Sequence, residues 1–250
     1  MTVGVFGLGR FGSFWSALLA SRFDVAAFDI DPSRALPEGV RRVTLQELCS
    51  CDLIFLCVTI RAVPQALASI APLLKPGILI ADTCSVKVEP ARWMREILPP
   101  HAGILATHPM FGPESAKDGL EGLSVMMDPV RASEDDVEYW SGIFRSFGLN
   151  VVRMSCDQHD REAAYSQALT HFVGRSLSRM GLPDTAIATR WFERLQAVVR
   201  QCVRDAPELF EDMQRFNPYS ERMRNTVMES FMATMAELDG DKTEAKAGAV

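Results

Sequence analysis

The 250-residue sequence lacks the features that mark metal sites, disulfides and membrane spans. Its six cysteines form no CxxC pair and no His/Cys cluster with the spacing of a zinc site. No stretch approaches the roughly 20 apolar residues of a membrane span, and the first strand begins at Thr2 without a charged and apolar leader. We therefore expect a cytoplasmic protein with reduced thiols, no metal and no membrane partner.

Basic residues are also in deficit, with 26 Lys and Arg against 32 Asp and Glu and a formal net charge of −6. Nucleic acids and anionic membranes require a basic surface, so neither is an expected partner. The content of 48% hydrophobic and 23% charged residues is that of an ordinary globular protein. The expected partner is a small molecule.

The first motif is Gly7-Leu8-Gly9-Arg10-Phe11-Gly12, which lies between a short apolar strand and a helical pattern. This is the context that a GxGxxG dinucleotide-binding loop requires. Gly7 allows the tight turn, Gly9 lets the backbone approach a pyrophosphate, and Gly12 lets the helix pack close to the sheet. All six residues are predicted to bind a cofactor.

Asp29 follows the second predicted strand, 22 residues after Gly7. The dinucleotide fingerprint has an acidic residue at about this distance, on the adenosine ribose. An ionised carboxylate would repel a 2′-phosphate, so the sequence predicts NAD rather than NADP. The alternative is an acidic turn residue without a ligand.

Strand and helix patterns alternate from residue 2 to about residue 108, which is typical of a Rossmann-type doubly wound α/β sheet. Ligands of such sheets bind at the carboxyl ends of the strands. Val58, Thr59 and Thr83 are predicted there as cofactor contacts, and the hydroxyl of Ser85 is predicted to face a ligand. Alternatively, Ser85 caps the helix that follows.

The segment His108-Pro-Met-Phe-Gly-Pro113 follows another apolar strand, at residues 103–106. A histidine titrates near neutrality, and the two prolines restrict the loop that holds it. His108 is thus predicted to accept a proton or a hydrogen bond from a hydroxyl. The alternative is a turn histidine without chemistry.

Strand patterns end near residue 155, which predicts a nucleotide-binding domain at 1–155 and a helical domain at 156–238. Helices are expected at 157–181, 184–206 and 217–239, with a shorter one between the last two. Residues 239–250 have almost no large apolar side chains and are predicted to be disordered. Gln167 and His171 share a polar stripe of the first helix, which is either a solvated face or a substrate-binding face.

Together these segments resemble the prephenate/arogenate dehydrogenase family of tyrosine biosynthesis. The matching residues are the glycine motif, Asp82-Thr-Cys-Ser85-Val-Lys87, the His108–Pro113 segment, and His159-Asp160 followed by Gln167-Ala-Leu-Thr-His171-Phe172. The resemblance spans most of the chain. It implies a nucleotide-binding domain followed by a helical domain that forms a homodimer.

The resemblance also implies a reaction, the NAD-dependent oxidative decarboxylation of a cyclohexadiene that carries a ring hydroxyl and a ring carboxylate. His108 would accept the hydroxyl proton as hydride leaves, and Ser85 would bind the same region and help to hold His108. Gln167 and His171 would contact the substrate across a cleft between the domains. His159 is expected to contribute much less to the chemistry.

One position departs from the family. An arginine for a substrate carboxylate usually lies six residues before an Asp-Pro-like element, and counting back from Pro207 gives Gln201. Arg194 lies seven residues earlier on the same predicted helix face and is predicted to supply the cation, with Gln201 donating a neutral hydrogen bond. The alternative is a solvated Arg194. The substrate therefore stays open among prephenate, arogenate and an amino-substituted analogue of a secondary pathway.

Two other functions are compatible with a Rossmann-type domain followed by helices. A β-hydroxyacid dehydrogenase uses a catalytic lysine on its helical domain, but this chain has no lysine between Lys117 and Lys242. An NAD-binding regulator without turnover would tolerate the neutral Gln201. Assays for NADH formation with prephenate and arogenate separate an enzyme from such a regulator.

Overall fold

The computed structural model describes the backbone of residues 1–247 and the side chains of residues 1–239. The chain divides into two compact units, Met1–Asp160 and Arg161–Val250. This division lies inside a helix, slightly after the boundary predicted at 155/156. It therefore keeps His159 and Asp160 with the first unit.

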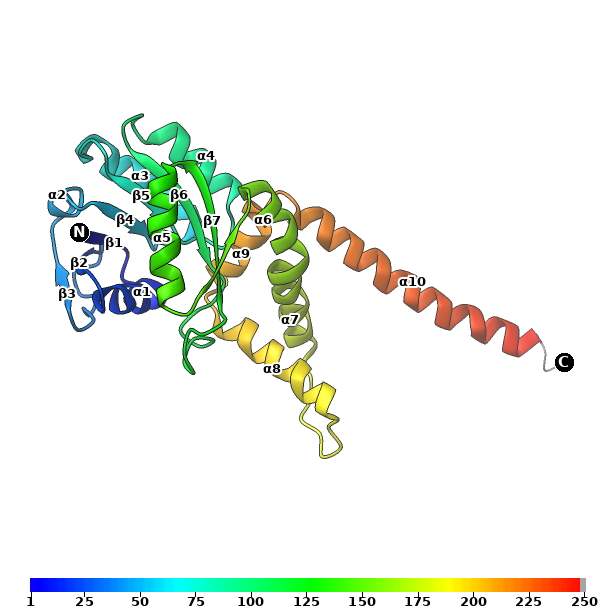
Figure 1. Ribbon diagram of the computed structural model, residues 1–250. Helices are drawn as coiled ribbons and strands as arrows, with labels where there is room; N and C mark the ends of the chain where they lie inside the picture. The colour runs from blue at the N-terminus through cyan, green and yellow to red at the C-terminus, as the bar shows by residue number, and fades with distance from the viewer. Residues whose placement is uncertain (248–250) are drawn as a thin grey trace. The chain divides into compact units, whose positions relative to one another are not determined.

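The first unit is a doubly wound α/β unit with one 8-stranded sheet in the order β3-β2-β1-β4-β5-β6-β7-β8 (Figure 1). Only the β6–β7 pair is antiparallel within this sheet of the described chain. The predicted Rossmann-type fold is confirmed. In chain order the elements are β1 (Thr2–Phe6), α1 (Arg10–Ala20), β2 (Asp24–Phe28), β3 (Val40–Arg42), α2 (Leu45–Leu48), β4 (Leu53–Leu56), η1 (Ile60–Ala62), α3 (Val63–Ile70), η2 (Ala71–Leu73), β5 (Leu79–Asp82), α4 (Val88–Ile97), β6 (Gly103–Pro109), β7 (Ser124–Arg131), α5 (Glu134–Ser146) and β8 (Asn150–Arg153).

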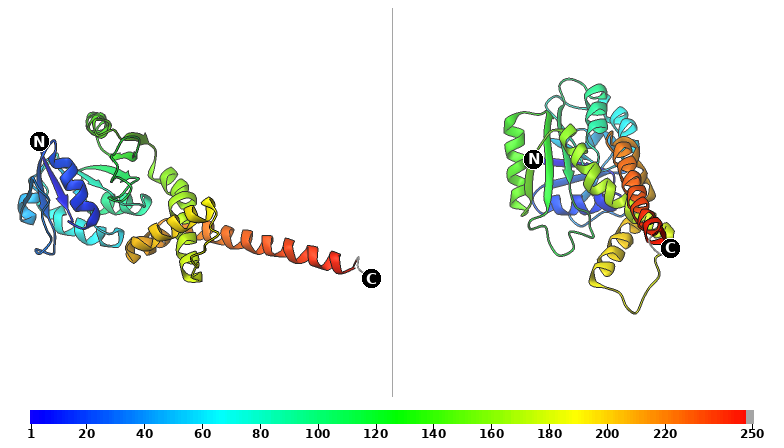
Figure 2. Two further views of the ribbon diagram at one scale, coloured as in Figure 1. Left: turned by 90° about the horizontal axis from the view of Figure 1, so that it is seen from below. Right: turned by 90° about the vertical axis from the view of Figure 1, so that its right-hand side faces the viewer.

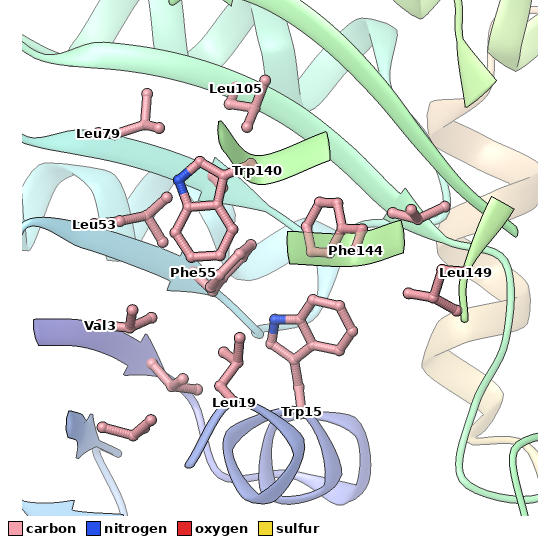
Figure 3. Packing of buried hydrophobic residues seen from close by; sticks show 14 of the residues in the cluster. Val3, Trp15, Leu19, Leu53, Phe55, Leu79, Leu105, Trp140, Phe144 and Leu149 are labelled. Carbon is pink, nitrogen blue, oxygen red and sulfur yellow. The ribbon is translucent and has the colours of Figure 1, made fainter. Parts of the chain in front are cut away.

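Aromatic side chains fill the space between the sheet and helices α1 and α5. The ring of Phe55, on β4, lies between the indoles of Trp15 and Trp140 at centroid distances of 5.5 and 5.3 Å (Figure 3). Both contacts are edge-to-face, the geometry that the ring quadrupoles favour. Helices α3 and α4 pack together on the opposite face of the sheet, away from α5 (Figure 2). Helices therefore cover both faces of the sheet, and the ends of its strands are left as the places where a ligand can bind.

Strand β6 differs from the prediction because it continues past Ala106 to Pro109. Its pairing with β5 ends where Asp82 faces Ala106, whereas its pairing with β7 continues to Pro109 and Val125. His108 thus lies on a strand, opposite Met126, and not in the loop that was expected. The extra backbone pairing comes from β7. The sequence analysis predicted this strand without stating whether it would be parallel or antiparallel.

The second unit is helical, as predicted. A single helical run crosses from the first unit, and a π-helical turn at Ala164–Ala168 interrupts it. Thr189 caps the next helix through Phe192, so this helix begins at Arg190 and not at residue 184. The elements are α6 (Cys156–Ala163), the π turn η3 (Ala164–Ala168), α7 (Leu169–Met180), α8 (Arg190–Arg204), α9 (Pro207–Phe216) and α10 (Ser220–Ala247).

Residues 239–247, which were predicted to be disordered, continue helix α10 to Ala247. Five of these nine residues are Ala, Lys or Glu, which favour a helix even without a large apolar side chain. Residues 248–250 of the predicted tail lie outside the described residues. Within the described chain, no helix is long and apolar enough to cross a membrane.

Candidate active site

The glycine motif forms the turn between β1 and α1 that its sequence predicted. Gly7 has φ of 105° and donates its N–H to the carbonyl of Phe28 at 2.8 Å. A Cβ on Gly12 would lie only 1.9 Å from the Gly7 carbonyl oxygen, so no larger residue fits there. A Cβ on Gly9 would meet no described atom within 4 Å, which leaves the backbone open on that side. This combination of a tight turn and an open backbone fits a pyrophosphate.

Asp29 is held against the same loop. One carboxylate oxygen accepts the N–H of Leu8 at 2.5 Å, and the other accepts the N–H of Asp31 at 2.8 Å. Arg34, which could offset a negative charge here, is paired with Asp31 at 3.4 Å. The half-buried carboxylate of Asp29 is therefore fixed at the carboxyl end of β2, where the ribose of a dinucleotide was expected.

The other predicted cofactor residues differ in their surroundings. Val58 and Thr59 follow β4, and Thr83 follows β5, where its hydroxyl donates to the carbonyl of Leu56 at 3.1 Å. Arg10 is exposed and pairs with Glu114 at 3.2 Å, while Phe11 stacks on Trp15 in the core at 5.6 Å. Since β2, β1, β4 and β5 are neighbours, all of these residues except the core-facing ring of Phe11 lie along one edge of the sheet.

His108 belongs to a chain of hydrogen-bonding groups within the first unit. Its Nδ1 lies 2.8 Å from Nε2 of His159, and Nδ1 of His159 lies 2.8 Å from Oδ1 of Asp160. Both oxygens of Asp160 accept backbone N–H groups at the start of α4, from Lys87 at 2.7 Å and from Val88 at 2.8 Å. The three side chains His108, His159 and Asp160 are buried, with exposed fractions of 3%, 3% and 0%.

A buried ion pair holds the backbone on which His108 stands. The ammonium group of Lys87 donates to Asp82 and to the carbonyl oxygen of Thr107, the latter at 2.5 Å. The hydroxyl of Thr107 in turn donates to the carbonyl of Asp82 at 2.5 Å. Both charged side chains have an exposed fraction of 0%. The residue before His108 is thereby fixed to the end of β5.

Burial lowers the pKa of His108 well below the usual 6.5, and the neighbouring His159 and the charge of Lys87 lower it further. This direction differs from the titration near neutrality that the sequence predicted. The imidazole is neutral at pH 7. Because Nδ1 is used by His159, the other ring nitrogen, Nε2, is the one that can act as a base.

The position of Ser85 also differs from the prediction. Its hydroxyl is buried and has no hydrogen-bond partner among the described residues, so it neither holds His108 nor caps α4, whose N-cap residue is Lys87. The group that holds His108 is His159. The unpartnered hydroxyl of Ser85 is a donor and acceptor that a bound ligand can satisfy.

The predicted substrate-binding residues belong to the second unit. His171 and Gln201 both approach the carboxylate of Asp205, with His171 Nε2 at 3.7 Å and Gln201 Nε2 at 3.5 Å. Arg175 donates to the carbonyl of Asp205 at 3.0 Å. Burial lowers the pKa of His171, and the charge of Asp205 opposes this effect.

Arg194 and Gln167 are not part of this group around Asp205. The guanidinium of Arg194 is exposed and lies 4.7 Å from the centroid of the Trp191 ring. Gln167 lies on the π-helical turn, and its side-chain oxygen is buried without a hydrogen-bond partner among the described residues. π-Helical turns are frequent at functional sites, so Gln167 keeps its place as a candidate contact.

Several residues of the site were not singled out from the sequence. Lys87 and Asp160 lie in segments that matched the family but were given no role, and His159 was given only a minor one. For Lys87 the available signal was a charged residue shortly after a buried strand. Arg175 and Asp205 gave a weaker signal, because a polar stripe on a helix is usually a solvated face. Within the described side chains, no group of three or more His, Cys, Asp or Glu could hold a metal ion.

Comparison with known proteins identifies the family. The family described as prephenate dehydrogenase, nucleotide-binding domain, matches residues 24–152, and the family described as TYRAAT1-like, C-terminal domain, matches residues 176–249. Arogenate dehydrogenase 1, chloroplastic, of Arabidopsis thaliana is 34% identical over 230 residues, which cover 87% of this chain and 36% of that protein. Arogenate dehydrogenase 2, chloroplastic, of the same plant is 32% identical over 258 residues, covering 96% of this chain and 70% of that protein.

A solved structure supports the fold. The prephenate dehydrogenase from A. aeolicus, in complex with hydroxyphenyl propionate and NAD+, superposes with a TM-score of 0.75. The two proteins are 18% identical, and the superposition covers 98% of this chain and 92% of that one. Since the first family matches just over half of the chain and the second plant relative is matched over most of its length, the chain belongs to the prephenate/arogenate dehydrogenase family.

Proposed function

We propose that this chain is an NAD-dependent dehydrogenase that oxidises and decarboxylates arogenate or prephenate. The main support is the buried, neutral His108, whose Nε2 is free of hydrogen bonds to the described residues. It lies on β6, at the sheet edge that also carries the glycine motif and Asp29. A base on the same sheet edge as a dinucleotide-binding loop is what the oxidation of a hydroxyl requires.

The proposed roles follow from the geometry of these residues. NAD, when bound, supplies the acceptor for the hydride that leaves the hydroxyl-bearing ring carbon. His108 Nε2 accepts the hydroxyl proton as the C–O bond gains double-bond character. Loss of the ring carboxylate as carbon dioxide then leaves an aromatic ring with a phenolate oxygen, to which His108 returns the proton. The proton and electron count closes without a metal.

Arogenate is the first substrate to test. The two plant relatives are named for it, and the comparisons favour neither a regulator without turnover nor an amino-substituted substrate. Within the helical unit, a carboxylate (Asp205) and a guanidinium (Arg175) lie together. Arogenate carries an ammonium group, which matches the charge of the Asp205 carboxylate, whereas prephenate has a keto group in place of the ammonium. The chain spans 36% of the first plant relative and 70% of the second, so its activity has to be measured on the chain itself.

The central test is the His108→Asn variant, assayed for NADH formation with arogenate and with prephenate. We expect kcat to fall by a factor of roughly 10² to 10⁴, the usual contribution of a positioned base, with the melting temperature and NAD binding retained. Because the pKa of His108 is lowered, the acid limb of the wild-type kcat/KM profile should lie below pH 6.5. His101→Asn, a change of an exposed histidine in the same unit, is the control. Normal turnover in His108→Asn would refute the proposal.

A second prediction concerns the cofactor: kcat/KM should be higher with NAD than with NADP. Two like unit charges about 4 Å apart at an effective dielectric of ~20 repel by roughly 4 kcal/mol, and Asp29 would impose this on a 2′-phosphate. Asp29→Asn should narrow the difference by raising the use of NADP. The matched control is Asp24→Asn, at the other end of the same strand. Equal wild-type efficiencies with both cofactors would contradict the assignment.

A third prediction concerns the cation for a substrate carboxylate. We propose Arg194 for this role, with Arg175 as the alternative because it lies beside His171 and Asp205. Arg194→Gln is expected to raise the substrate KM sharply with little change in kcat, and Gln201→Arg to improve the use of prephenate. Arg200→Gln, on the same helix but another face, is the control. If only Arg175→Gln raises KM, the cation is Arg175 and the proposal for Arg194 fails.

A fourth prediction is a homodimer formed through the helical unit. Helix α10 exposes an apolar stripe with i, i+3, i+4 and i+7 spacing, which a second copy would cover. Its members are Met228, Phe231, Met232, Met235 and Leu238, each between 52% and 62% exposed. Light scattering should give the mass of a dimer at micromolar concentration, and Phe231→Asp should lower it, whereas Glu229→Ala should not. A stable wild-type monomer would exclude this assembly.

The cytoplasmic location of the protein stays a prediction.

A further inference from the structure

The side chains around His108 determine which of its nitrogens carries the proton. A neutral imidazole has one N–H and one bare nitrogen, and only the bare nitrogen accepts a proton. For His108 the two possibilities have opposite consequences. With the proton on Nδ1, Nε2 is a base; with the proton on Nε2, the same atom is a donor and cannot take a proton from a hydroxyl.

The assignment begins at Asp160. Its two oxygens accept the backbone N–H groups of Lys87 and Val88, at 2.7 and 2.8 Å, where helix α4 starts. A carboxylate at a helix N-terminus is stabilised by these donors and by the helix dipole. Asp160 is therefore an acceptor toward His159 as well. The ring nitrogen that faces it at 2.8 Å, Nδ1 of His159, has to carry a hydrogen.

The next step passes to His108. A neutral His159 with its hydrogen on Nδ1 has a bare Nε2, which lies 2.8 Å from Nδ1 of His108. The contact is a hydrogen bond only if Nδ1 of His108 donates. The rings meet at an interplanar angle of 71° with centroids 5.0 Å apart, so they do not compete by stacking. The proton of His108 is thus placed on Nδ1.

We propose that His159 and Asp160 are positioning residues, which hold His108 in the tautomer that leaves Nε2 free to accept the substrate hydroxyl proton. The proposal rests on the proposed function for the role of Nε2, but the tautomer itself is a property of the free protein. It gives His159 a larger role than the sequence indicated. When His108 accepts a proton, the Nδ1–H of the imidazolium remains bonded to His159, with the charge of Asp160 beyond it.

The expected kinetic effect is on kcat. His159→Leu removes the acceptor and should lower kcat by roughly 10²-fold, within the range found when an orienting partner of a catalytic histidine is lost. The KM for NAD should stay within about twofold, since Asp29 and the glycine motif are untouched. His159→Gln, whose side-chain oxygen can still accept from Nδ1 of His108, should recover most of the loss. A purely structural role of His159 would instead lower the melting temperature of both variants and change kcat and KM together.

The decisive measurement is independent of turnover. The chain has four histidines, so ¹⁵N-histidine spectra of the wild type and of single variants assign every ring. Near pH 7.5 we expect His108 and His159 each with a protonated Nδ1 and a bare Nε2. In His159→Leu the hydrogen of His108 should shift toward Nε2, whereas in the control His101→Leu it should stay on Nδ1.

Two results would overturn the inference: a wild-type His108 protonated on Nε2, or a His108 tautomer that is unchanged in folded His159→Leu. If that variant does not fold, His159→Gln carries the same test through its hydrogen bond to Nδ1, and loss of the Nδ1–H signal there would also overturn it. If the tautomers are as expected but the protein turns over neither arogenate nor prephenate, the proposed function fails while the tautomer assignment stands.

Discussion

The rest of the site depends on the hydrogen bonds of the fully buried ammonium group of Lys87. A buried charge is tolerated only where it is paired and hydrogen-bonded, and here Asp82 and the carbonyl of Thr107 meet that need. The backbone N–H of the same residue binds Asp160. Since Thr107 precedes His108 and Asp160 follows His159, one residue fixes both ends of the imidazole pair. Removal of the ammonium would leave the buried carboxylate of Asp82 with only the backbone N–H groups of Cys84 and Thr107, which is a large cost for an interior charge.

The burial that positions His108 also weakens it as a base, because its pKa is lowered by desolvation and by nearby Lys87 and His159. A weak base is sufficient for the proposed reaction. The hydroxyl becomes strongly acidic as hydride leaves its carbon, since the oxygen is turning into a carbonyl. What the reaction requires is an imidazole that is unprotonated when the substrate arrives and a proton-accepting nitrogen that points in a fixed direction. A dry, hydrogen-bonded site supplies both without reorganisation during the reaction.

The sequence predicted the fold and the main candidate residues because their signals are local. Gly12 could be placed from its spacing to Gly7, and His108 from the strand and prolines around it. The contact between His108 and His159 could not, because it joins β6 to α6 across 51 positions and depends on how that helix packs. Ser85 was given the holding role that belongs to His159, since both were known only as members of matching segments. The continuation of helix α10 to Ala247 was not predicted, because the lack of large apolar side chains after residue 239 was interpreted as disorder.

The residues around His108 and the charged residues around Asp205 belong to different units of the chain. The glycine loop, Asp29, His108 and the groups that orient it all belong to residues 1–160, so the base is prepared by the first unit alone. The charges around Asp205 belong to the helical unit. An arginine at position 201 would face the carboxylate that Gln201 now approaches at 3.5 Å and would be partly neutralised by it. With glutamine there, that carboxylate keeps its charge for a cationic group. If the proposed function is correct, a change of substrate charge would be met by the helical unit, while the proposed tautomer of His108 would depend on the first unit alone.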